Sequence, residues 1–304
     1  MNRRRRHPPL PAFAVMAMLL LSAFALSSCA EPTATTLPRG VTVDVYQGRF
    51  DYADHALEVA VANATTLPFT VLALSFSSPT FTPPVNYERA PTTIQPGDTV
   101  NLRLLLPPAD CSASSGEPRV HVRYVFGEAA GSATKDTPAT GVADLTPRDR
   151  MGQLPTIAAE DCRDDAVAAV ATIEPATALR YVTLAGQQTA VLDFTATPTG
   201  AGGLLMIDDV RGTVLVGALD PANGKVGDTV PLGLDIGRAT SPVTFSLTLV
   251  PARCDPHVVV EDKRGTFFTF TVTTKLDTGR IFIGVNDAVR VELYDYVGRR
   301  CGWS

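Results

Sequence analysis

The chain has few residues of several kinds, and each shortage excludes a class of protein. Of 304 residues, only four are histidine, five are methionine and one is tryptophan. Basic residues gather only in the first six positions, and the net charge is −5. A protein that coats nucleic acid needs a basic surface, so the composition predicts no nucleic-acid partner. Glycine (23) and proline (24) are frequent enough for many turns but too rare for collagen or a low-complexity chain.

Sequence motifs that carry familiar chemistry are also missing. There is no Gly-x-Ser-x-Gly elbow, and the run Gly200–Gly203 lacks the Lys-Ser/Thr pair of a phosphate-binding loop. No cysteine has another within four residues, which disfavours a zinc site. Only Met151 and Met206 follow the first 28 residues, which disfavours a methionine-rich copper site. We therefore expect no catalytic residue, no bound metal and no cofactor.

The first 28 residues have the organisation of an export signal. Arg3–Arg6 form a basic segment, and Ala12–Leu26 form an uncharged apolar run that is short for a membrane span. The run ends in Leu26-Ser27-Ser28-Cys29, which resembles the lipobox of bacterial lipoproteins. This resemblance implies a signal peptide at 1–28, a lipid on Cys29 and a tether at 29–40 that holds the chain to a membrane. The alternative is an ordinary cleaved signal peptide with Cys29 as an unrelated thiol.

The remaining cysteines agree with export. They are Cys111, Cys162, Cys254 and Cys301. An even number in an oxidising compartment predicts two disulfides, for which three connectivities exist. We favour Cys111–Cys162 and Cys254–Cys301, because each pair then lies within one expected domain. Each bond would close a loop of about 50 residues and contribute about 4 kcal/mol on the chain-entropy model.

The segment 41–147 has the pattern of a β-sandwich. His55–Ala62, Asp98–Leu106 and Arg119–Phe126 each alternate apolar and polar residues, as half-buried antiparallel strands do. Pro96-Gly97-Asp98 and Pro107-Pro108 mark turns between them. Roughly seven short strands in about 100 residues predict an immunoglobulin-like sandwich.

The segment 148–175 differs and predicts a linker, with one short helix at Ile157–Val170 whose apolar stripe is poor. A second β-rich segment follows at 176–304, with expected strands at Val243–Leu249 and Thr266–Thr274 and a turn at Asn223-Gly224. Its last expected strands, Ile281–Val285 and Val289–Tyr296, would pair around Asn286-Asp287. The predicted fold class is therefore all-β, with two tandem immunoglobulin-like sandwiches.

Two short sequences recur in the two halves. Gly97–Val100 (GDTV) returns as Gly227–Val230, and Pro108-Ala109-Asp110-Cys111 is echoed by Pro251-Ala252-Arg253-Cys254. Each of these cysteines follows an apolar strand. The echoes are unequally spaced, so the sequence leaves open a diverged duplication or two sandwiches with similar strand endings.

The most distinctive run is Cys254-Asp255-Pro256-His257, followed by three valines and then Glu261-Asp262-Lys263-Arg264-Gly265-Thr266. It resembles a segment of a family of exported actinobacterial lipoproteins, which also carry a strand and then a cysteine in their first half, like Leu102–Cys111. The resemblance extends loosely over most of the chain after the signal. It implies an exported, lipid-anchored protein and brings no activity with it.

This run allows more than one interpretation. A metal site would use His257 with Cys254 or Asp255 and with Glu261 or Asp262, but one histidine with carboxylates is a thin ligand set. We favour a disulfide, an Asp-Pro turn and a charged hairpin loop. The loop is the best candidate contact surface, through Asp255, His257, Glu261, Asp262, Lys263 and Arg264. The alternative to a contact surface, which we favour over it, is that Val258–Val260 form a buried edge strand and the charged residues only solvate a hairpin.

Other titratable residues predict no further site. His55 and His121 stand alone on expected strands, which is typical of surface or hydrogen-bonded histidines. Asp208 and Asp209 are neighbours on an expected strand, so we expect them to face opposite sides of the sheet and not to act as a pair.

Three functions fit these observations to different degrees. The favoured one is a lipid-anchored, non-enzymatic binding or scaffolding protein at the outer face of the cytoplasmic membrane, whose partner is an envelope protein or ligand. The first alternative is a metal-assisted hydrolytic enzyme centred on His257. The second is the substrate-binding lipoprotein of a transporter, which requires two α/β lobes with long helices.

Overall fold

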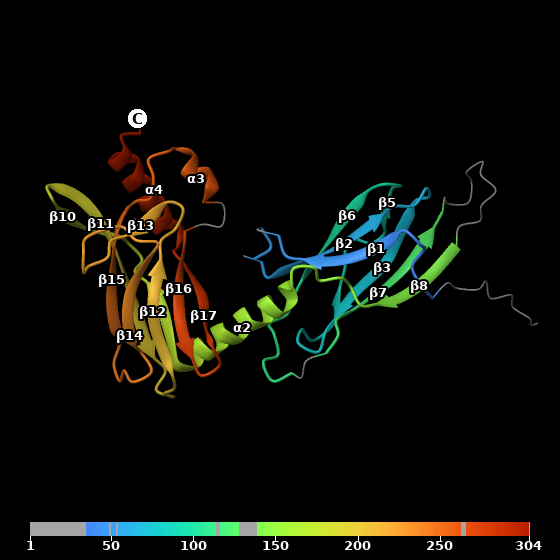
Figure 1. The fold of residues 1–304 in the computed structure, drawn as a ribbon, viewed down its shortest axis with the longest axis horizontal. Helices are drawn as coiled ribbons and strands as arrows, with labels where there is room; N and C mark the ends of the chain where they lie inside the picture. The colour runs from blue at the N-terminus through green and yellow to red at the C-terminus, as the bar shows by residue number, and fades with distance from the viewer. Residues whose placement is uncertain are drawn as a thin grey trace, which may run out of the picture.

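The chain forms two β-sandwiches that lie side by side and are joined by one long helix (Figure 1). The computed structural model describes residues 35–48, 50–52, 54–113, 116–127, 139–262 and 266–303. The predicted signal peptide (1–28) and the lipid site at Cys29 lie outside the described residues. Within the described ranges, no helix is long and apolar enough to cross a membrane.

Sandwich 1 consists of eight antiparallel strands in two sheets. The sheet β1-β2-β6 packs against the sheet β4-β3-β7-β8, with β5 paired to β3. The strands are β1 (Val41–Tyr46), β2 (Ala56–Asn63), β3 (Phe69–Ser77), β4 (Val85–Asn86), β5 (Thr92–Ile94), β6 (Thr99–Leu105), β7 (Arg119–Phe126) and β8 (Ala139–Leu145). The predicted alternation is confirmed, because Leu57, Val59 and Val61 of β2 are fully buried between the sheets.

Helix α2 (Gln153–Val170) lies where the sequence predicts a linker with a shorter helix. It begins four residues before the predicted start, because the Asp149 carboxylate accepts the backbone N–H groups of Gln153 and Leu154. Leu154 and Ile157 belong to the core of sandwich 1, whereas Val167 and Val170 belong to the core of sandwich 2. The helix therefore packs into both sandwiches, and its weak apolar stripe reflects two separate contacts.

Sandwich 2 has two sheets of antiparallel strands and two further helices. The sheet β10-β11-β15-β13, with β9 paired to β11, packs against β14-β12-β16-β17. The strands are β9 (Ala171–Pro175), β10 (Arg180–Leu184), β11 (Gln187–Pro198), β12 (Leu205–Arg211), β13 (Val216–Ala218), β14 (Thr229–Asp235), β15 (Val243–Pro251), β16 (Phe267–Thr274) and β17 (Thr278–Gly284). The helices are α3 (His257–Glu261) and α4 (Asp287–Cys301).

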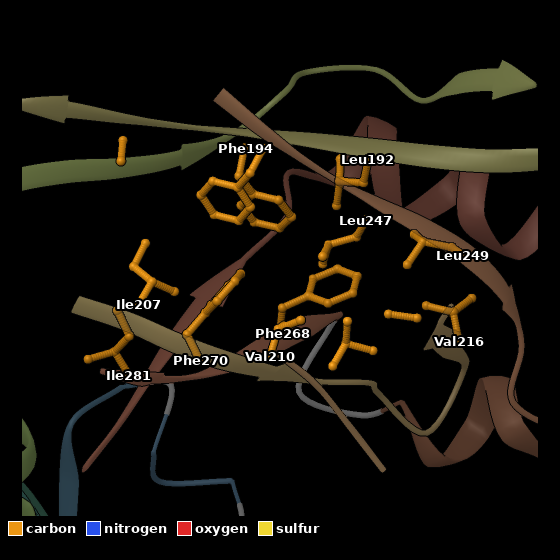
Figure 2. Packing of buried hydrophobic residues seen from close by; sticks show 14 of the residues in the cluster. Leu192, Phe194, Ile207, Val210, Val216, Leu247, Leu249, Phe268, Phe270 and Ile281 are labelled. Carbon is orange, nitrogen blue, oxygen red and sulfur yellow. The ribbon is translucent and has the colours of Figure 1, made fainter. Parts of the chain in front are cut away.

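The core of sandwich 2 is built around aromatic rings from both sheets. Phe194 of β11 contacts the edges of Phe268 and Phe270 of β16, with ring centroids 5.7 and 5.2 Å apart (Figure 2). Such edge-to-face pairs stabilise a core beyond the area that they bury. Together the two sandwiches confirm the all-β prediction, and the residues that the structure describes form no α/β lobe of the kind expected of a transporter substrate-binding protein.

Two segments predicted as extended are helical. The predicted strand Val289–Tyr296 lies within α4, whose first turn is capped because the Asn286 side chain accepts the N–H of Val289. Leu293, Tyr296 and Val297 then pack into the core at helical spacing. The valines 258–260, predicted as a hairpin loop or a buried edge strand, lie within α3.

The two sandwiches repeat one arrangement. In each, one sheet contains an antiparallel pair (β2–β6, β11–β15), and the other has four strands in the same order (β4-β3-β7-β8, β14-β12-β16-β17). A helix follows the last strand of each, and a cysteine just after β6 or β15 reaches that helix. The sulfur atoms of Cys111 and Cys162 lie 2.09 Å apart, and those of Cys254 and Cys301 lie 2.01 Å apart. This geometry fits the predicted pairing.

Of the two short sequences that recur in the two halves, only one falls at equivalent positions of the two sandwiches. The cysteine echo falls after β6 and β15, which occupy equivalent positions. The GDTV echo instead spans the first residues of β6 and β14, which belong to different sheets of their sandwiches. The first echo therefore has a structural counterpart, and the second reflects two unrelated strand starts.

Candidate binding site

In the described part of the predicted contact loop, Asp255, His257 and Glu261 pair with residues close to them in the sequence. The Asp255 carboxylate accepts the N–H of His257 and lies 2.7 Å from its ring Nδ1, and 82% of the His257 side chain is exposed. Glu261 forms an ion pair with Arg253. The members of the expected ligand set thus have separate partners. Lys263 and Arg264 lie outside the described residues.

Asp262, expected at the contact surface, is buried instead. Its Oδ2 accepts hydrogen bonds from the hydroxyls of Thr266 and Tyr294, each at 2.9 Å. Burial, together with the bond to Asp262, raises the pKa of Tyr294 to about 12. The residue therefore joins the end of α3 to α4. Among the described residues, no group of three histidine, cysteine or acidic side chains could hold a metal ion.

The prediction for Asp208 and Asp209 is wrong because β12 contains a bulge. The register of β12 against both neighbouring strands shifts between Ile207 and Asp209. As a result, Asp209 accepts a hydrogen bond from the hydroxyl of Thr271, and Asp208 accepts one from the hydroxyl of Thr273. These two threonines are two residues apart on β16 and therefore lie on the same face of the sheet. The carboxylates lie on the same face, where each is held by a threonine.

His55 links sandwich 1 to α2. It lies in the turn before β2, with a φ of 51°, and not on the expected strand. Its Nδ1 is 3.0 Å from the carbonyl oxygen of Leu106, and its Nε2 is 2.9 Å from Oδ1 of Asp161. The bond to Asp161 raises the pKa of His55, although burial acts against it. The other Asp161 oxygen accepts the N–H of Ala109 at 2.9 Å.

The second half of α2 is clasped by sandwich 2. The guanidinium of Arg163 donates to both carboxylate oxygens of Asp277, at 3.1 and 2.5 Å, and to the carbonyl oxygen of Arg280 at 3.1 Å. Only 10% of the Arg163 side chain is exposed. Bidentate pairing of this kind fixes both position and orientation. Together with His55 and the cysteine pair at Cys162, this clasp makes α2 a fixed connection between the sandwiches.

A cleft of about 210 Å³ lies at this connection. It is lined by Asp161 and Asp164 of α2, by His55, and by Phe267 and Phe282 of sandwich 2, among others. Asp164 retains contact with solvent, yet desolvation and the nearby charges of Asp161 and Glu160 raise its pKa to about 6. The cleft is therefore the place where α2, sandwich 1 and sandwich 2 meet.

A larger groove runs along sandwich 1. It has a volume of about 530 Å³ and is lined by residues 83–86, 88 and 89 on one side and 103–107 of β6 and the following loop on the other. We call it the β6 groove. It lies at the open side of sandwich 1, between the edges of its two sheets. Its lining combines aliphatic and proline residues with the polar side chains of Asn86, Glu88, Arg89 and Arg103.

The β6 groove contains backbone groups that face away from β2. The N–H of Leu106 bonds to the carbonyl oxygen of His55, and the N–H of Asn63 bonds to that of Asp98. In an antiparallel pair these positions alternate, so the N–H and C=O groups of Arg103 and Leu105 point to the other edge. Among the described residues, β2 is the only strand paired with β6. Sequence reasoning missed this site because it depends on which strands do not pair.

No protein-family model matches the chain, and no curated protein matches it either. Solved structures with some likeness include the CsuC–CsuE chaperone–tip adhesion subunit complex of Acinetobacter baumannii Csu pili, at 11% identity and a TM-score of 0.19. That alignment covers 81% of this chain and 100% of the other. An Amycolatopsis orientalis exo-chitosanase aligns at 13% identity and a TM-score of 0.18, over 81% of this chain but 26% of the enzyme. Likeness at this level assigns neither family nor function.

Proposed function

We propose that this chain is a lipid-anchored binding or scaffolding protein without catalytic activity, held at the outer face of the cytoplasmic membrane. The observation that carries the binding role is the β6 groove, where a strand edge lies open along a cavity of about 530 Å³. Loops and edges on a rigid sandwich are frequent binding sites.

The location rests on the N-terminal sequence. Arg3–Arg6, the apolar run that follows and Cys29 have the order of a lipoprotein signal. The two cysteine pairs at bonding distance support an oxidising compartment. A lipid anchor on the tether at 29–40 would leave both sandwiches facing outward from the membrane.

The enzyme alternative has little support from the geometry. It requires Cys254, His257 and a carboxylate to converge on one metal ion. Cys254 lies 2.01 Å from Cys301 through their sulfur atoms, Glu261 is paired with Arg253, and Asp262 is turned inward. His257 is left with Asp255 alone, which is too few ligands for a transition metal.

Replacing Cys29 by Ala tests the anchor. We expect the wild-type protein in the membrane fraction, extractable only with detergent, because two acyl chains hold a protein stably at about 0.8 kcal/mol per buried methylene. The Cys29→Ala protein should appear in the medium or remain uncleaved. A variant that is processed and still membrane-bound would contradict the lipid anchor, and Cys162→Ala provides a control for general loss of a cysteine.

A further inference from the structure

The last residues of the predicted tether are fixed to sandwich 1. The hydroxyl of the buried Tyr124 donates to the carbonyl oxygen of Thr36 at 2.5 Å, and Leu37 packs against the core. The free part of the tether therefore ends at Thr36. Seven residues along the chain separate Thr36 from Cys29, so even a fully extended connection between them spans at most about 25 Å.

The tether joins sandwich 1 at the end where β1 begins. The β2–β3 loop and the β5–β6 loop close this end and are bonded to their neighbours. The N–H of Ala64 bonds to the carbonyl oxygen of Gly40, and the N–H of Gly97 bonds to that of Asn63. We call this end of sandwich 1 the base, and it consists of residues 36–40, 64–68 and 95–98.

The β6 groove and sandwich 2 lie away from the base. β1 runs from the base toward α2, with sandwich 2 beyond it (Figure 1). β6 runs in the same direction, because β1 and β6 both pair antiparallel with β2. It has seven residues, so Leu105 at its far end is about 20 Å from the base. The 18 residues of α2 then extend about 27 Å to sandwich 2.

We propose that the base rests on the membrane, where the short tether holds it against the lipid head groups, and that sandwich 2 stands away from the surface. The inference rests on the proposed lipid anchor and specifies which end of the protein faces the membrane. The tether is too short to let the base move far from a lipid on Cys29, whereas sandwich 1 and α2 separate sandwich 2 from that lipid.

The side chains of the base suit contact with head groups and not insertion among acyl chains. Its charged residues are Arg39 and Asp98, one of each sign. The exposed Ala64, Thr66 and Gln95 are neutral. No large apolar side chain of these described segments is exposed, and burial of apolar side chains is what holds a surface within the acyl boundary. The base therefore depends on the tether to stay at the membrane.

The charge of the rest of the chain favours the same orientation. The chain carries 26 basic and 31 acidic residues, and four of the basic ones belong to the predicted signal peptide as Arg3–Arg6. The acidic surplus thus lies outside the base. Anionic lipids attract basic segments and repel acidic ones. The base is therefore the end that meets the least repulsion from such a membrane.

Fluorescence quenching by lipids compares the two ends of the molecule. The lipoprotein is purified in detergent and reconstituted into vesicles of phosphatidylcholine and phosphatidylglycerol, some of whose head groups carry a nitroxide quencher. A fluorescent amino acid replaces the exposed Thr66 of the base or the exposed Leu184 of β10, on the far side of sandwich 2 (Figure 1). We expect quenching at position 66 to be at least twice that at position 184.

A longer tether tests the reason for this contact. Insertion of about 20 Gly/Ser residues after Thr33 raises the mean span of a flexible tether to roughly 25–30 Å. We expect it to lower the quenching at position 66 at least twofold. The same insertion after Gly224, in the exposed turn before β14, is the matched control and should leave that quenching unchanged.

The outcomes separate the orientation from the anchor. A protein that does not float with the vesicles overturns both. A protein that floats but is quenched equally at positions 66 and 184 overturns the orientation alone, as does quenching at position 66 that the longer tether leaves unchanged. Stronger quenching at position 66 that the longer tether weakens supports the proposal.

Discussion

At the scale of single residues, His55 has two acceptors and needs two protons. Its ring nitrogens face the Leu106 carbonyl and the Asp161 carboxylate, and a neutral imidazole can donate only one hydrogen bond. The ionised ring satisfies both acceptors, which is consistent with its raised pKa. Phe81 also contacts the ring, and the charged groups of the adjoining cleft are Glu160, Asp164 and Arg280.

The raised pKa of His55 predicts a pH dependence of stability. A histidine whose folded pKa exceeds its ordinary value of about 6.5 stabilises the fold fully below that value and loses the contribution as pH rises through the folded pKa. We expect the free energy of unfolding to fall by up to about 1 kcal/mol as the pH rises above about 6.5, a modest value because the pair is partly exposed.

Denaturant titrations at several pH values measure this effect. His55→Gln keeps a donor toward Asp161 but cannot ionise, so it should remove the fall in stability. His121→Gln, on the outer face of β7, is the matched control and should keep the wild-type profile. A His55→Gln protein with the wild-type pH profile would show that another group is responsible.

At the scale of elements, Arg163 of α2 packs directly against the backbone of Gly279 in β17. A Cβ atom on Gly279 of β17 would overlap the guanidinium of Arg163, so the clasp on Asp277 requires glycine there. We expect Gly279→Ala to lower the free energy of unfolding by about 1–3 kcal/mol, the usual cost of overpacking.

A double-mutant cycle identifies the cause of that loss. Arg163→Ala removes the guanidinium, so Gly279→Ala should cost much less in its presence than alone. The expected coupling is at least about 1 kcal/mol. Additive costs in chemical denaturation would mean that Gly279 is needed for its backbone and not for the clasp.

Strands were the predictable elements, and helices at their margins were not. In β6 and β7 one face is mostly buried and the other mostly exposed, so the two-residue alternation is visible in the sequence. The segment 289–296 carries apolar residues that suit both a strand and a helix, and the deciding feature is the Asn286 cap. In α3, Val258 is buried and Val260 exposed, which only a helical turn after Pro256 explains.

The sites were harder to predict than the elements. His55 and Asp161 are 106 residues apart, so no local pattern brings them together. The bulge in β12 changes the face of one carboxylate without any glycine or proline to mark it. The cysteine pairs could be predicted, because nearest-neighbour pairing follows from the two-sandwich organisation. The β6 groove depends on how the segment between β3 and β4 runs past β6, which no local pattern in the sequence indicates.

At the scale of the whole molecule, the two sandwiches differ at one edge: β13 pairs with β15, whereas among the described residues only β2 pairs with β6. Sandwich 2 is completed by β13, and α2 holds it against sandwich 1 through the Arg163 clasp and the His55 bond. The open groove is therefore carried on a firmly connected pair of domains. A lipid at Cys29 would keep this pair near the membrane, where a partner could reach the β6 groove.

Site-specific photocrosslinking on intact cells tests this account most directly. A photoreactive amino acid at position 105, in the β6 groove, is compared with one at position 291 on α4, since Leu105 and Val291 are 59% and 55% exposed. The account predicts one dominant adduct from position 105 and no such adduct from position 291. The same adducts from both positions, or none from position 105 with the protein present at the membrane, would contradict it.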